Sequence, residues 1–78
     1  MARVSSKQIE KMLDMLYSLG FDYTLNRPDR DYRLHIWPRI RVPDLWPREI
    51  YFIGTLGQCY EVMKAVVMAV MVDRAMRK

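Results

Sequence analysis

The chain is poor in the residues that form covalent and metal cross-links, since it has one cysteine, Cys59, and one histidine, His35. A single cysteine cannot form a disulfide within the chain, which excludes the small secreted domains that depend on disulfides. One thiol and one imidazole cannot by themselves fill a tetrahedral zinc site. We therefore expect no metal and no cofactor.

Long apolar runs are also missing. The longest uninterrupted one, residues 65–72, is far shorter than the roughly 20 residues that a membrane-spanning helix needs. The first part of the chain mixes charged and apolar positions and lacks the apolar centre of a secretory signal. These absences predict a cytoplasmic protein without a membrane partner.

The length of 78 residues predicts one domain, residues 1–78, and the hydrophobic fraction of 51% is typical of a folded chain. A chain of this size buries only about 60 to 65% of its unfolded surface. Since no disulfide or metal is expected to compensate, stability must come from tight helix packing or from oligomerisation.

A first helix is predicted from Ser5, because Ser5 and Gln8 have the spacing of a capping box. Val4 and Ile9 have the spacing of a hydrophobic staple. Apolar residues then recur every three or four positions up to Tyr17, and Gly20 suits the left-handed position that ends a helix.

A β-hairpin is predicted next. Phe21, Tyr23 and Leu25 alternate with polar residues, and residues 26–31 are rich in turn formers. In the second strand Tyr32, Leu34 and Ile36 form the inner face, which places Arg33, His35 and Trp37 on the outer face. Ile40 and Val42 also alternate with arginines, so a short edge strand is an option there.

The segment after Pro47 has two interpretations. In one, residues 50–53 form a third strand, Gly54 a turn and Thr55 the N-cap of a helix. In the other, which we favour, a single long helix begins at Pro47. The favoured interpretation depends on one apolar stripe that keeps helical spacing across both glycines: Phe52, Leu56, Cys59, Met63, Val66 and Val70. The predicted fold class is therefore α+β, in the order helix, hairpin, long helix.

The C-terminal helix also carries apolar residues on its far side, and a helix that is apolar all round is buried all round. One short helix and a hairpin cannot surround it. We therefore expect a homodimer in which two such helices pack antiparallel across a two-fold axis. The predicted interface residues are Met68, Val72, Met76, Ala65 and Ala69.

The net charge is +4, and between Arg27 and Arg48 all the basic residues are arginines, apart from His35. Arginine pairs with phosphate or carboxylate and stacks on rings. The candidate partner- or nucleic-acid-binding set combines these arginines with aromatic residues: Arg33, His35, Trp37, Arg39, Arg41, Trp46 and Arg48. The competing interpretation is that both tryptophans fold over the rim of the core.

Catalytic motifs are lacking. His35 has no carboxylate or nucleophile beside it in the sequence. Cys59 lies on the predicted core stripe, and residues 54–57 lack the lysine of a phosphate-binding loop. We expect no enzymatic activity.

Four segments together resemble small uncharacterised proteins encoded by tailed phages and prophages: residues 7–17, 23–26, 32–34 and 48–51. The resemblance spans roughly the first fifty-five residues. It departs in the hairpin loop, where Arg27 to Arg30 replace a glycine pair, and in the longer last helix. It implies a phage-like origin and an αββα fold, and no established activity.

The interpretation with a third strand would give an order of elements that resembles a double-stranded-RNA-binding domain. That family has a lysine cluster where Gln58, Glu61 and Lys64 stand here. Residues 51–56 also faintly resemble the last strand of AP2-type domains, without their tryptophan-rich pattern. The leading hypothesis is thus an accessory protein acting by protein–protein interaction, for instance by inhibiting a host or defence factor. The alternative is a small nucleic-acid-binding protein.

Overall fold

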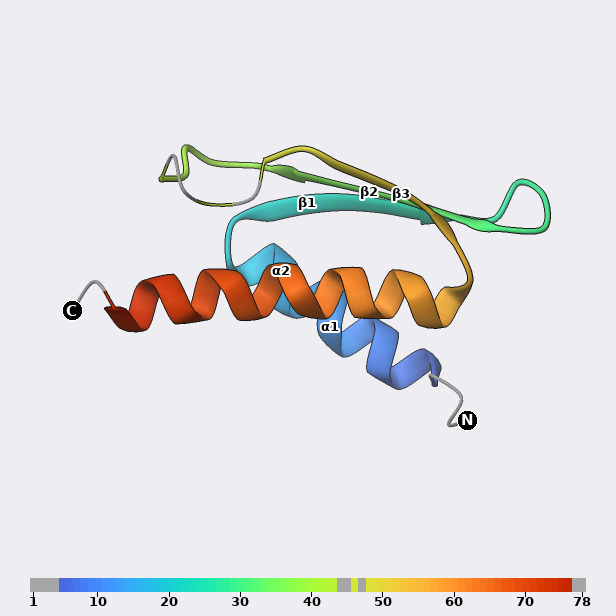
Figure 1. Ribbon diagram of the computed structural model, residues 1–78, viewed down its shortest axis with the longest axis horizontal. Coiled ribbons are helices and arrows are strands. Elements are labelled where there is room, and N and C mark those ends of the chain that lie inside the picture. Colours follow the sequence, from blue (N-terminus) through green and yellow to red (C-terminus); the bar gives the residue numbers. More distant parts are fainter. Residues whose placement is uncertain (1–4, 44–45, 47, 77–78) are drawn as a thin grey trace.

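The computed structural model describes residues 5–43, 46 and 48–76 and shows a sheet covered on one face by two helices (Figure 1). The three strands are antiparallel in the order β1-β2-β3. The α+β fold class is confirmed. The elements are α1 (Ser6–Ser18), β1 (Phe21–Asn26), β2 (Tyr32–Pro38), β3 (Ile50–Gly54) and α2 (Leu56–Met76).

The ends of α1 follow the predicted signals. The Gln8 amide donates to Ser5 Oγ at 3.2 Å, and the Ser5 amide donates to Gln8 Oε1 at 2.8 Å, which completes the capping box. Gly20 ends the helix at a φ of 101°, where a side chain would be strained and its Cβ would lie 2.5 Å from Ile40 Cδ1. Val4, the other half of the predicted staple, lies outside the described residues.

The hairpin of β1 and β2 is confirmed. In its register Leu25 faces Leu34 and Tyr23 faces Ile36. Leu34 and Ile36 are buried against the helices. At the far end of β2 the Arg39 amide donates to the Gly20 carbonyl at 2.7 Å, which ties the end of the hairpin to the end of α1.

The favoured single helix from Pro47 is wrong. Residues 50–54 form β3, in which Phe52 pairs with Leu34 and Tyr51 with His35. A second capping box then begins α2: the Gln58 amide donates to Thr55 Oγ1 at 3.2 Å, and the Thr55 amide donates to Gln58 Oε1 at 2.9 Å. In β3 alternate backbone N–H and C=O groups of Ile50–Gly54 form hydrogen bonds with β2. A helix through the same residues would include both Gly54 and Gly57, and each glycine lowers the stability of a helix relative to alanine.

The predicted helical phase across Gly54 has a simple explanation. Phe52 on the inner face of β3 and Leu56 in the first turn of α2 both face the same core, where they are partly buried. Their four-residue spacing therefore imitates a continuous helix. The short strand around Ile40 and Val42 is also wrong, because residues 39–43 are irregular: Val42 is buried and Ile40 is exposed.

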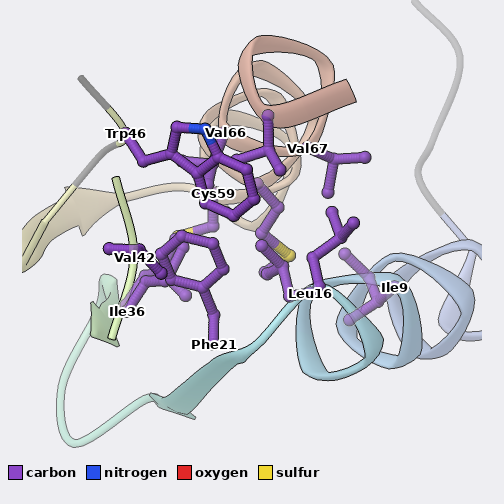
Figure 2. Close-up of a cluster of buried hydrophobic side chains, with 13 residues drawn as sticks. Ile9, Leu16, Phe21, Ile36, Val42, Trp46, Cys59, Val66 and Val67 are labelled. Atoms are coloured by element: carbon purple, nitrogen blue, oxygen red, sulfur yellow. The ribbon is translucent and has the colours of Figure 1, made fainter. Parts of the chain in front are cut away.

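The core lies between the sheet and the helices (Figure 2). From α2 it contains the predicted stripe Cys59, Met63, Val66 and Val70, together with Val67. From the rest of the chain it contains Ile9, Leu16, Leu19, Phe21, Leu34, Ile36, Val42 and Trp46. No helix in the described part of the chain is long and apolar enough to cross a membrane.

Candidate functional site

The face of the sheet that points away from both helices carries the candidate site. We call it the outer sheet face and define it as Thr24, Asn26, Arg33, His35, Trp37, Tyr51 and Ile53. Alternation along each strand puts these side chains on one side, since their neighbours Leu34, Ile36 and Phe52 point to the core. Register then aligns them in rows across the sheet, with His35 between Thr24 and Tyr51, and Arg33 between Asn26 and Ile53.

Three rings form an aromatic row on this face. The His35 ring stacks on Tyr51 with centroids 3.9 Å apart and an interplanar angle of 12°. The Trp37 ring is tilted by 41° relative to the His35 ring, and their centroids lie 4.5 Å apart. Tyr51 remains 72% exposed. The row therefore offers flat apolar surface to a partner, at a small entropic cost because the rings already support one another.

Glu49 fixes the histidine within this row. Its Oε2 atom lies 3.1 Å from His35 Nε2 and comes from the residue just before β3. The carboxylate partner that the sequence does not place near His35 is thus supplied by the fold. The side chains differ in exposure, with 22% for His35 and 59% for Glu49, so the pair lies at the surface.

A shallow hollow of about 260 Å³ lies beside the row. Its lining includes hydroxyl, amide and guanidinium groups from Thr24, Asn26 and Arg33, and rings from His35 and Tyr51. Ile53 supplies an apolar side chain, and Leu34 and Phe52, whose side chains point to the core, also border the hollow. A surface of this kind can hold a planar or extended group by stacking and by hydrogen bonds from either side.

The predicted arginines are dispersed around this face. Arg33 belongs to it and lies 3.8 Å from Asp29 in an exposed ion pair. Arg39 turns to the helical layer instead: it lies 4.0 Å over the Tyr17 ring and donates to the Tyr17 carbonyl at 2.8 Å. Arg41 and Arg48 are exposed on the connection between β2 and β3.

Trp46 does not join the outer sheet face, and here the competing interpretation holds. Only 9% of Trp46 is exposed, and its ring stacks on Phe21 with centroids 6.4 Å apart (Figure 2). Its indole N–H donates to Asp73 on α2, and Arg74 lies 5.9 Å from the ring. Burial of this ring is favourable because it removes a large apolar surface from water and packs it on Phe21 and beside α2.

The sequence analysis missed Glu49, Tyr51, Thr24, Asn26 and Ile53. Tyr51, Ile53 and Glu49 were assigned to a helix, where they would not align with β2. For Tyr51 and Ile53, the sequence signal is the run of β-branched and aromatic residues 50–53 directly before Gly54, which is typical of a strand.

The Cys59 thiol and the possible metal-binding side chains were the other candidates for catalytic chemistry. The Cys59 thiol is fully buried, and burial raises its pKa, so the thiolate is disfavoured. Within the described residues no group of three or more His, Cys, Asp or Glu side chains could hold a metal ion.

The predicted interface residues of α2 are all exposed in the single chain: Ala65, Met68, Ala69, Val72 and Met76. More than half of Met68, Val72 and Met76 is accessible. The far side of α2 is thus left uncovered by the other elements that the structure describes.

Comparison with protein-family models, with curated proteins and with solved structures finds no match to this chain. Function is therefore inferred from the geometry above.

Proposed function

We propose that this chain is a non-catalytic binding domain that engages a protein partner through its outer sheet face. The observation that carries the proposal is the aromatic row of Trp37, His35 and Tyr51 on a sheet face that neither helix covers. Tyrosine, tryptophan and arginine are the residues that most often anchor protein interfaces.

The charges around the row favour a protein over a uniformly anionic ligand. Arg33 is paired with Asp29, and Glu49 is held at His35. Groups of both signs at the rim suit a partner with complementary groups of both signs, and they give specificity more than raw affinity. The resemblance of residues 7–17, 23–26, 32–34 and 48–51 to small phage and prophage proteins supports an accessory role, such as blocking a host or defence factor by covering its surface.

Affinity enrichment from bacterial lysate, with quantitative mass spectrometry, tests this proposal. Tyr51→Ala removes the most exposed ring of the row without touching the core. Met68→Ala is the matched control, since Met68 is exposed on the helical side. We expect one protein to be retained by the wild type and by Met68→Ala and lost with Tyr51→Ala. Equal recovery with all three would overturn the proposal.

Nucleic-acid binding is the second candidate, favoured by a different observation. Arg33 is exposed on the same face as the stacked rings, and Arg41 and Arg48 are exposed on the connection between β2 and β3, which suits phosphate neutralisation with base stacking. The observed order of elements is also the one that resembles a double-stranded-RNA-binding domain. The start of α2 argues against that particular mode, because Gln58 and Glu61 stand where that family has lysines.

Salt dependence separates the two candidates. Electrostatic binding to a generic RNA or DNA duplex should fall steeply between low and moderate salt, because phosphate contacts release counterions. Binding of this kind that is lost in Arg33→Gln would favour nucleic acid. Absence of binding at low salt would eliminate it.

A further inference from the structure

The outer edge of β3 is open. In the described part of the chain, β3 pairs with β2 and with no other strand. Alternate backbone amides and carbonyls of Ile50–Gly54 therefore point away from the sheet. Edge strands are normally protected by lysine, proline or a bulge, yet this one reads Ile-Tyr-Phe-Ile-Gly, with Tyr51 72% and Ile53 61% exposed.

An uncharged flank of α2 lies on the same side of the molecule. In the helical layer α1 packs on β1, whereas α2 packs on β2 and β3 (Figure 1). Met71 and Arg74 border a hollow with Leu19, so that flank of α2 faces α1. The opposite flank carries a row at steps of four and three residues, which we call the α2 row: Gln58, Val62, Ala65, Ala69, Val72 and Met76.

We propose that both features are covered by a second copy of this chain. The β3 strands of two copies pair antiparallel across a two-fold axis, and each α2 row packs against the same row of the other copy. An isologous interface of this kind uses one patch twice. The result is a six-stranded antiparallel sheet with four helices on one face.

Spacing supports the joint arrangement. Neighbouring strands lie about 4.8 Å apart, so the axis would pass about 2.4 Å outside β3. Since α2 packs on both β2 and β3, it would lie about 5 Å from that axis. Two such helices would then be about 10 Å apart, which is within the usual distance between packed helices. A single two-fold rotation would therefore bring both the β3 strands and the α2 helices of two copies to the distances at which they pair and pack.

Charge favours a second copy as the occupant. Each chain has a net charge of +4, and a two-fold interface brings like residues close to one another. Neither β3 nor the α2 row contains a charged side chain, so this side can approach its own copy without repulsion. The charges on α2 that border the row are Glu61 on one side and Asp73 on the other, and Asp73 accepts a hydrogen bond from the Trp46 indole.

The available area sets an upper limit on the size of such an interface. The molecule measures 41 × 23 × 16 Å, and α2 has 21 residues, which corresponds to a length of about 31 Å. Seen down the shortest axis, α2 is drawn in front of α1 (Figure 1). A patch along α2 over the full height of the two layers has an upper limit on the order of 700 Å², because β3 has only five residues, and this lies at the small end of stable interfaces, which bury roughly 800 Å² per partner.

The dimer would enlarge the outer sheet face, a consequence that rests on the function proposed above although the dimer itself does not. Tyr51 and Ile53 line the hollow from the edge strand. A partner strand beside β3 would continue that wall. The hollows of both copies would then share one continuous surface.

Sedimentation equilibrium over a wide concentration range tests the pairing. We expect a mass of twice 9.4 kDa at high concentration. Ala65→Glu in the α2 row and Ile53→Lys in β3 should each raise the dimer Kd by about a hundredfold, because charges would face their own copies. The matched controls are Ala75→Glu, exposed on another side of α2, and Thr24→Lys, exposed on the other edge strand. Both should leave the Kd unchanged.

Hydrogen exchange identifies the edge directly. Amides of β3 should become protected as the concentration rises, whereas the outer amides of β1 should not. A mass of 9.4 kDa at every concentration would overturn the proposal, as would dissociation of the controls or protection at β1. Protection of β3 only when a partner protein is added would assign the edge to that partner instead. Tyr51→Ala bears on the proposed function alone if it stays dimeric and loses the partner.

Discussion

Glu49 Oε2 lies 3.1 Å from His35 Nε2, although the two residues are fourteen positions apart in the chain. His35 lies in the middle of β2, and Glu49 directly precedes β3. The contact exists because His35 pairs with Tyr51 across β2 and β3, which brings the start of β3 beside the middle of β2. It orders the aromatic row at the centre of the outer sheet face.

Glu49→Gln should leave stability nearly unchanged and weaken partner binding. The pair is exposed, and surface ion pairs contribute about 0 to 1 kcal/mol. The His35 ring would lose its charged partner and hence part of its fixed orientation. Urea denaturation and partner affinity measure the two effects. An affinity equal to that of the wild type would show that the orientation of His35 does not matter for binding.

Thr55→Ala should destabilise the protein by about 1 kcal/mol, because it removes the N-cap of α2. Thr24→Ala on β1 is the matched control and should change the free energy of unfolding by less than about 0.5 kcal/mol. Urea denaturation of both variants measures the difference. If Thr55→Ala were neutral, a capped start of α2 at this position would be contradicted.

Gly20→Ala should cost about 1 to 3 kcal/mol, since the residue has a φ of 101° and its added Cβ would meet Ile40. Gly57→Ala, inside α2, should instead stabilise by up to about 1 kcal/mol, because alanine is the better helix former. The two substitutions are therefore expected to change the free energy of unfolding in opposite directions, although both replace glycine by alanine. Thermal unfolding followed by circular dichroism is the measurement.

Trp46→Ala should destabilise by about 3 to 5 kcal/mol, as expected for deletion of a buried ring. Trp37→Ala, on the outer sheet face, should cost much less and should weaken partner binding instead. Trp46→Phe keeps an aromatic ring beside Phe21 but loses the hydrogen bond to Asp73, so an intermediate loss is expected. A stable Trp46→Ala variant with impaired binding would reverse the assignments of the two tryptophans.

Stability should fall as the pH rises above about 9, partly through Cys59. Burial raises the pKa of its thiol above the ordinary value of 9.0. The unfolded chain therefore loses this proton at lower pH than the folded chain, so the stabilisation is complete below pH 9 and decreases above it. Cys59→Ala should show a smaller loss over this range in denaturation curves. An identical pH dependence would exclude Cys59 as a cause.

Prediction from sequence succeeded where a local signal was sufficient. The capping box at Ser5, the left-handed Gly20 and the alternation of Leu34 and Ile36 each depend on neighbours a few residues away. It failed at residues 50–53, where a short apolar run satisfies a strand and a helix equally well. It also failed to separate Trp37 from Trp46, because no local pattern around Trp46 shows that its ring packs on Phe21 and α2.

The sequence by itself determined α1, the hairpin, the inner and outer faces of β2 and an α2 that is apolar on more than one side. Only the tertiary structure decided that Ile50–Gly54 is a strand, that Trp46 enters the core, and that Glu49 and Tyr51 meet His35. The physical reason is that caps and alternation are short-range properties. The pairing of β3 with β2 and the burial of a ring against α2 depend on contacts between residues distant in the chain.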